Sequence, residues 1–179
     1  IYLKGEFGVD PAEPRVLADG KTVLVSTFSC GLYKLNGLSG NNPTADLIHS
    51  FGGDDCALPV VPGNFWVATV PASNALVSLD VSDPSKPREA GRLTFEKTDK
   101  PHWIALEPAG KRIVMSGGKG TLVSSLYIID IDTKTGKLSL DDTFKDKGAT
   151  KPGISFDREE WPHGKNGRGI PHGAVFSKP

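Results

Sequence analysis

Four residues at corresponding places along the chain have side chains that could bind a metal or an anionic ligand. His102 and His172 each follow a proline and precede an apolar run, and Arg15 and Cys56 stand at the matching points of two earlier segments. Imidazole is a ligand for Zn, Cu, Fe or Ni, a thiolate favours softer metals such as Zn or Cu(I), and a guanidinium holds a carboxylate with its planar fork. The types of these residues predict a transition-metal site, Cu or Zn, at His102 and His172, and ligand binding by Arg15 and Cys56. The alternative is a structural role, with waters and backbone groups as their partners.

Two further stretches carry polar groups that could serve such a site. Asp55, next to Asp54, stands directly before Cys56 and could orient a ligand histidine or act as a general base. His163 lies in a long polar stretch and could fold over the site as a lid, although an exposed loop histidine is the alternative reading. The sequence assigns no catalytic residue.

A repeat is what would bring these residues together. A glycine, an apolar run and a Ser or Thr recur at intervals of roughly 45 residues, a period typical of β-propeller blades. The three copies start at Gly20, Gly63 and Gly110. Each is followed by a further strand-like run, a polar turn and an outer strand that closes on Phe51, Phe95 or Phe144.

The repeat predicts an all-β fold of propeller blades, each with four antiparallel strands. We expect blades at 14–53, 54–98 and 99–145, a long loop at 146–169, and a final inner strand at 170–179. The innermost strands of a propeller run beside its axis, so residues a whole blade apart, such as His102 and His172, would converge at one channel mouth. Three blades and one strand do not close a ring, which indicates either part of a larger propeller, the reading we favour, or assembly with a second copy.

Composition limits the classes of partner. The chain has 179 residues, with 21 Lys and Arg against 21 Asp and Glu. This balance gives no reason to expect nucleic acid or an anionic membrane as a partner. No apolar run approaches the roughly 20 residues of a membrane span, so we expect a soluble chain. The chain begins within what looks like a strand at 1–9, which indicates processing or a fragment.

Cys30 and Cys56 form no short metal or redox motif. An intramolecular disulfide between them is conceivable but not indicated, so the sequence leaves the compartment open.

The stretch DVSDPSKPR at 80–88 resembles a strand and turn of the selenium-binding protein and methanethiol oxidase family. In the same order as in that family follow GKRIV at 110–114, IDIDT at 129–133 and a terminal strand that holds His172. The resemblance covers roughly Pro59 to Phe176, and blades of the lactonase and YVTN-repeat propellers are similar too. It implies a seven-bladed ring, a metal held by His172 and His102, and oxidation of a small thiol. The more N-terminal Cys and His motifs of the family have no counterpart here.

Three functions follow as hypotheses. The first is a metal-dependent oxidoreductase of the methanethiol oxidase type. The second is a lactonase-like or cyclase-like propeller, in which His and Arg polarise a small carboxylated substrate. The third is a non-catalytic propeller whose rim binds a protein partner.

Overall fold

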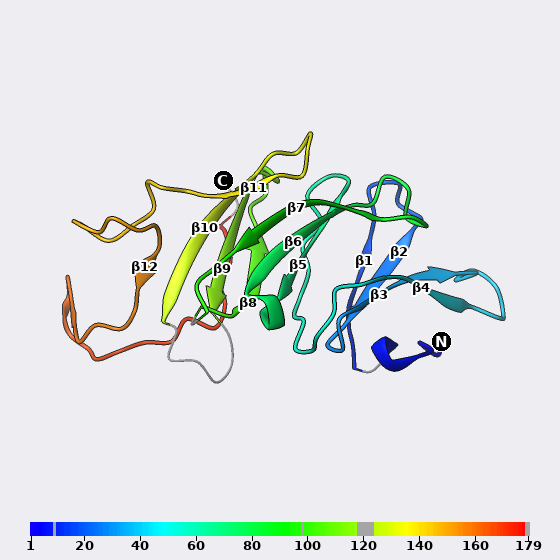
Figure 1. The fold of residues 1–179 in the computed structure, drawn as a ribbon, viewed down its shortest axis with the longest axis horizontal. Helices are drawn as coiled ribbons and strands as arrows, with labels where there is room; N and C mark the ends of the chain where they lie inside the picture. Colours follow the sequence, from blue (N-terminus) through cyan, green and yellow to red (C-terminus); the bar gives the residue numbers. More distant parts are fainter. Residues whose placement is uncertain (9, 98, 118–123, 178–179) are drawn as a thin grey trace.

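The computed structural model describes residues 1–8, 10–97, 99–117 and 124–177 as a row of antiparallel sheets, the architecture of a partial β-propeller (Figure 1). The prediction of an all-β propeller is confirmed. The first blade holds β1 (Pro11–Val16), β2 (Val23–Thr27), β3 (Gly31–Asn36) and β4 (Thr44–Ser50). The second holds β5 (Phe65–Val70), β6 (Ala75–Asp80) and β7 (Arg88–Thr94). The third holds β8 (Pro101–Leu106), β9 (Arg112–Gly117), β10 (Ser125–Ile131) and β11 (Leu138–Leu140).

The three repeated glycines lie in turns that precede strands. Gly20, Gly63 and Gly110 have φ of 68°, 60° and 73°, so each takes the left-handed backbone that a side chain disfavours. Each glycine ends the tight turn that leads into the second strand of its blade. The turn therefore sets the start of β2, β5 and β9, and the apolar run that follows is free to enter the core.

The second blade differs from the prediction at its inner strand. The run from Asp54 to Leu58 forms no strand, and only Val60 pairs with Val67, through two backbone hydrogen bonds of 3.0 and 2.9 Å. Pro59 and Pro62 flank this bridge. Because proline has no amide hydrogen, the ladder cannot extend far to either side.

Two buried clusters of side chains join the blades. Alternate residues of a strand point to opposite faces, so Trp66 and Ala68 of β5 pack toward the first blade while Phe65 and Val67 pack toward the third. All six residues of β5 are buried as a result. We call the cluster between the first two blades the first interface and the cluster between the second and third blades the second interface.

The chain termini depart from the prediction. Residues 1–8 contain the 3-10 turn η1 (Glu6–Gly8) instead of a strand. They pack on the outer side of the first blade, where the Tyr33 hydroxyl donates a hydrogen bond to Lys4 O at 2.7 Å. Residues 170–177 form no strand either, because they take no backbone ladder with a neighbour among the described residues.

The expected long loop at 146–169 carries short pieces of sheet. These are β12 (Ile154–Ser155), which pairs with β10, and the hairpin of β13 (Glu160–Trp161) and β14 (Gly164–Lys165). Helix in the described residues amounts to η1 and η2 (Pro71–Ser73), and neither turn could cross a bilayer.

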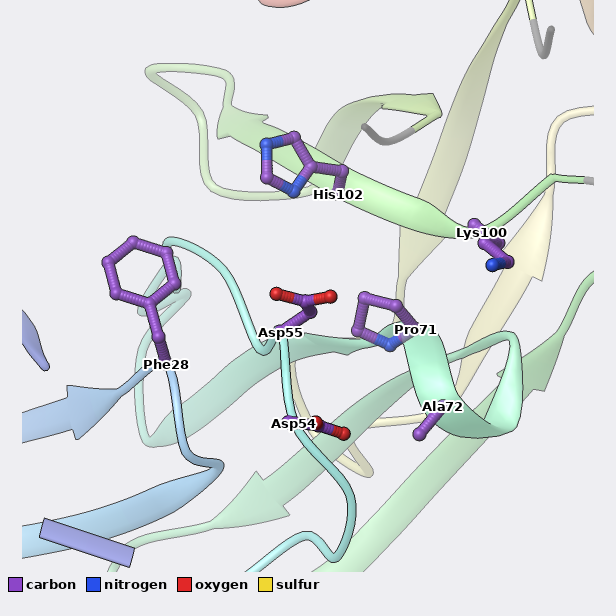
Figure 2. A pocket seen from close by; sticks show the side chains of 7 residues that line it. All are labelled: Phe28, Asp54, Asp55, Pro71, Ala72, Lys100 and His102. Carbon is purple, nitrogen blue, oxygen red and sulfur yellow. The ribbon is translucent and has the colours of Figure 1, made fainter. Parts of the chain in front are cut away.

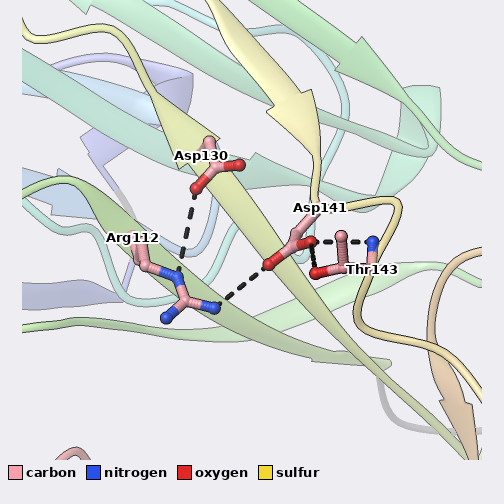
Figure 3. A network of polar contacts seen from close by, with 4 residues as sticks. All are labelled: Arg112, Asp130, Asp141 and Thr143. Atoms are coloured by element: carbon pink, nitrogen blue, oxygen red, sulfur yellow. Dashed lines mark hydrogen bonds and ion pairs between the residues drawn. The ribbon is translucent and has the colours of Figure 1, made fainter.

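A half-exposed polar network fixes the rim of the third blade (Figure 3). Arg112 Nη2 lies 3.1 Å from Asp141 Oδ2, and Arg112 Nε lies 4.0 Å from Asp130 Oδ1. Asp141 also accepts hydrogen bonds from the hydroxyl and the amide of Thr143, and chiefly the hydroxyl lowers the pKa of this carboxyl. The network joins β9, β10 and the turn after β11.

Candidate functional site

A hollow of about 420 Å³ opens where loops of all three blades meet (Figure 2). We call it the Asp55–His102 hollow. Its lining residues come from the loop after β2, the loop before Cys56, the turn η2 and the start of β8: Phe28, Asp54, Asp55, Pro71, Ala72, Lys100 and His102. Figure 2 shows the Asp55 carboxylate and the His102 ring on facing sides of one space, with Phe28 toward one end and Lys100 toward the other.

The loop that carries the two aspartates turns sharply. Gly52, Gly53 and Asp55 have φ of 73°, 80° and 63°, so three of four consecutive residues take the left-handed conformation. A Cβ on Gly53 would lie 2.4 Å from the Ala72 Cβ, which shows how closely the loop approaches η2. The paired glycines therefore let the loop fold back and present Asp54 and Asp55 to the hollow.

Lys100 is also held in an unusual conformation. Its φ is 31°, although it precedes Pro101 and a residue before proline is driven toward extended backbone. A left-handed non-glycine residue costs about 1–3 kcal/mol and persists where its surroundings hold it there. Two such residues, Asp55 and Lys100, lie in the wall of this one hollow, and clustered strain of this kind is typical of functional sites.

A disulfide fixes one side of the hollow. Cys30 and Cys56 are bonded, both are buried, and their Cα atoms lie 5.1 Å apart. The Cys56 amide also donates to Phe28 O at 3.2 Å. The prediction that Cys56 is a ligand is wrong, because its sulfur is bonded to Cys30 and offers no thiolate. The sulfur instead ties the aspartate loop to the first blade.

The structure brings the two predicted histidines together. The rings of His102 and His172 stack with centroids 5.3 Å apart and planes inclined by 26°. The His172 ring also lies 5.8 Å from Trp103, against which Gly173 packs. The C-terminal segment thus reaches the start of β8, as expected, although it forms no strand.

Arg15 and His163 lie elsewhere. Arg15 donates to Pro59 O at 3.3 Å and forms an ion pair with Glu13. It lines a separate hollow with Trp103, so Arg15, Cys56, His102 and His172 do not form the single ring that the repeat predicted. His163 is exposed and stacks loosely on Trp161, with ring centroids 6.4 Å apart. It is not among the residues that line the Asp55–His102 hollow.

Sequence reasoning missed Phe28, Lys100 and η2 as parts of the site. A signal existed for Lys100, which directly precedes the Pro-His pair, and for Phe28, which stands two residues before Cys30. Within the described residues, no group of three or more His, Cys, Asp or Glu side chains is placed to hold a metal ion.

Comparison with known proteins identifies the fold. No family model matches the chain, and no curated protein matches it. Among solved structures, one similar protein comes from Bacteroides fragilis NCTC 9343 and has a provisional assignment as a 6-phosphogluconolactonase. It superposes with a TM-score of 0.60 at 12% sequence identity, and the match covers 77% of this chain and 39% of the Bacteroides chain. The periplasmic gluconolactonase PpgL of Pseudomonas aeruginosa superposes with a TM-score of 0.58 at 16% sequence identity. The match covers 84% of this chain and 40% of PpgL.

A hypothetical selenium-binding protein from Sulfolobus tokodaii gives a TM-score of 0.56 at 10% identity, over 75% of this chain and 35% of its own. The chain therefore spans about two fifths of the length of these structures or less. At such identities the likeness shows the fold alone. This chain has the blade architecture of a β-propeller that lactonase-like and selenium-binding-like proteins share.

Proposed function

We propose that the Asp55–His102 hollow binds a small, polar cyclic ester and promotes its hydrolysis, as a lactonase-like propeller would. The observation that carries the proposal is the composition of the hollow. Two carboxylates, an ammonium, an imidazole and an aromatic ring surround a space of about 420 Å³, which is within the size range of small-ligand sites. Two of the propellers that resemble this chain bear lactonase names, which supports this reading over oxidation of a thiol.

The side chains suit the steps of ester hydrolysis. A water molecule attacks the lactone carbonyl while a base takes its proton, and Asp55 and His102 face the space in which that water would lie. The carbonyl oxygen gains negative charge, which the ammonium of Lys100 stabilises. When the ring C–O bond breaks, the protonated base returns its proton to the leaving oxygen, and a hydroxy acid remains. The Phe28 ring offers an apolar face to the substrate.

The transition-metal hypothesis has weaker support. His102 and His172 stack as neighbouring rings, but a catalytic zinc site uses three protein ligands and the described residues supply no such group. The described residues therefore do not complete a metal site. Metal analysis of the purified protein tests this hypothesis: stoichiometric Cu or Zn that is lost in His102→Ala/His172→Ala would establish it.

Glucono-δ-lactone is a suitable probe of the hydrolase proposal. We expect the protein to accelerate its hydrolysis above the rate in buffer, measured as acid release at constant pH. His102→Gln and Asp55→Asn each remove a candidate base, and loss of the true base lowers kcat by roughly 100- to 10,000-fold. Asp142→Asn, an exposed carboxylate on the rim of the third blade, is the matched control and keeps full activity. A wild-type rate equal to that of buffer, or full activity in both hollow variants, would contradict the proposal.

A further inference from the structure

The side chain of Thr69 connects the two segments that form the Asp55–His102 hollow. Thr69 lies in β5, and its side chain is fully buried. Its hydroxyl accepts a hydrogen bond from the Ala57 amide at 3.1 Å and donates one to His102 O at 3.3 Å. One hydroxyl therefore joins the aspartate loop of the second blade to the inner strand of the third.

Each of the two backbone groups that bind Thr69 lies two residues after a strained residue of the hollow. Ala57 follows Asp55 by two residues, and His102 follows Lys100 by two residues. Asp55 and Lys100 are the lining residues other than glycine that have positive φ, at 63° and 31°. A contact just beyond each one is suitably placed to keep its backbone in the unfavourable conformation, because strain persists only where neighbouring structure fixes it.

In the described parts of the other two blades, the hydroxyl at the corresponding position does not connect two segments of the chain. Ser26 in β2 and Ser116 in β9 stand as far after Gly20 and Gly110 as Thr69 stands after Gly63. Both hydroxyls are buried, and neither has a hydrogen-bond partner among the described residues. Thr69 is distinguished by its two partners, both of which lie in segments that line the hollow.

We propose that Thr69 is a positioning residue of the hollow, which sets the separation of Asp55 from His102 and Lys100. The inference rests on the proposed function for its catalytic consequence. Thr69 itself is buried behind the wall and acts through the two backbone segments. The disulfide holds the aspartate loop against the first blade, and the Thr69 hydroxyl holds the same loop against the third.

Thr69→Val removes the hydroxyl and nearly keeps the shape of the side chain, and Thr69→Ser retains the hydroxyl. In Thr69→Val we expect amide exchange at Ala57 to rise at least tenfold and the NMR signals of Asp55, Lys100 and the His102 ring to move. With glucono-δ-lactone, kcat/KM should fall roughly 10- to 100-fold, mainly through kcat, as small misplacements of catalytic groups do. Thr69→Ser should restore both readouts.

Ser116→Ala is the matched control, since it removes a buried hydroxyl at the same blade position without breaking a hydrogen bond seen among the described residues. It should leave Ala57 exchange and kcat/KM unchanged. Should Thr69→Val not fold, Thr69→Ala provides the same comparison with less steric demand.

Unchanged Ala57 exchange and unchanged signals of Asp55 and Lys100 in the folded Thr69 variant would overturn the inference, as would equal effects of Ser116→Ala. A wild-type protein without lactone hydrolysis would contradict the proposed function alone. The exchange and NMR readouts would then still decide whether Thr69 positions the hollow.

Discussion

The two interfaces between blades contain similar numbers of buried residues but differ in the interactions that stabilise them. The first interface contains the Cys30–Cys56 disulfide and Trp66 in one buried cluster. The second contains aromatic and aliphatic side chains, among them Phe65, Met115 and Ile129, and no cysteine. Segments of all three blades line the Asp55–His102 hollow. The disulfide tethers the aspartate loop to the first blade, and the Thr69 hydroxyl links the same loop to the third blade. The geometry of the hollow should therefore be most sensitive to substitution on its third-blade side, where no covalent bond holds it.

The largest loss of stability is expected from Trp66→Ala at the first interface. Trp66 is fully buried, and truncation of a buried Trp costs about 3–5 kcal/mol in free energy of unfolding. Ile129→Ala, at an equally buried position of the second interface, should cost about 2–5 kcal/mol. Urea unfolding measures both values. A loss below about 1 kcal/mol for Trp66→Ala would show that the first interface relies on its disulfide and not on packing.

Removal of the disulfide should have the next largest effect. The bond closes a loop with a sequence separation of 26 residues, and loops of this length contribute about 3–4 kcal/mol by the chain-entropy model. Cys30→Ala/Cys56→Ala should therefore lower the midpoint of unfolding, and a reducing agent should lower that of the wild type but not that of the variant.

Coupling between substitutions sharpens the same comparison. The disulfide and Trp66 belong to one cluster, so their effects should depart from additivity by about 0.5–3 kcal/mol. The disulfide and Ile129 belong to different clusters and should add. Strong coupling of the disulfide to Ile129 instead would mean that the two interfaces respond structurally to one another.

A titration reports on the edge of the second interface. Tyr127 packs edge-on against Phe95 with ring centroids 5.4 Å apart. Burial, followed by the charge of Asp99, raises the pKa of the Tyr127 phenol to about 12. A raised pKa means that folding favours the neutral phenol, so this stabilisation is complete below pH of about 10 and is lost as the pH rises toward 12.

Tyrosinate absorbance should therefore show a component that titrates at a pH of about 12 and disappears in Tyr127→Phe. Asp99→Asn should lower the pKa of Tyr127, because it removes the neighbouring negative charge. A wild-type titration without this late component would show that this edge of the second interface is open to water.

The blades were predictable from the sequence because their signals are local. Glycines such as Gly20 and Gly110 indicate turns, and the apolar runs that follow them indicate strands, without reference to distant parts of the chain. The approach of His172 to His102 followed from the repeat. The position of Arg15 did not, because strand irregularities lie between Pro11 and Pro14 and between Pro101 and Trp103, and such shifts change which face a side chain occupies.

The disulfide and the role of Thr69 depend on contacts between blades. Neither the spacing of Cys30 and Cys56 nor the type of residue 69 reveals that the two segments meet. The Ser or Thr that ends each apolar run was visible in the sequence, but the contacts of Thr69 with Ala57 and His102 were not.

The smallest effect is expected at the polar rim of the third blade. Arg112 and Asp130 are about half exposed, and an exposed ion pair contributes only about 0.2–1 kcal/mol. Arg112→Ala should therefore lower the free energy of unfolding by less than about 1 kcal/mol, and added salt should reduce the difference from the wild type further. Thr143→Val is the companion variant, because it removes the hydroxyl that holds Asp141 without changing the charge, and its effect should not depend on salt. A loss as large as that of Trp66→Ala would place stability in the polar rim, and the contrast between the two buried interfaces would then no longer explain how this row of blades holds together.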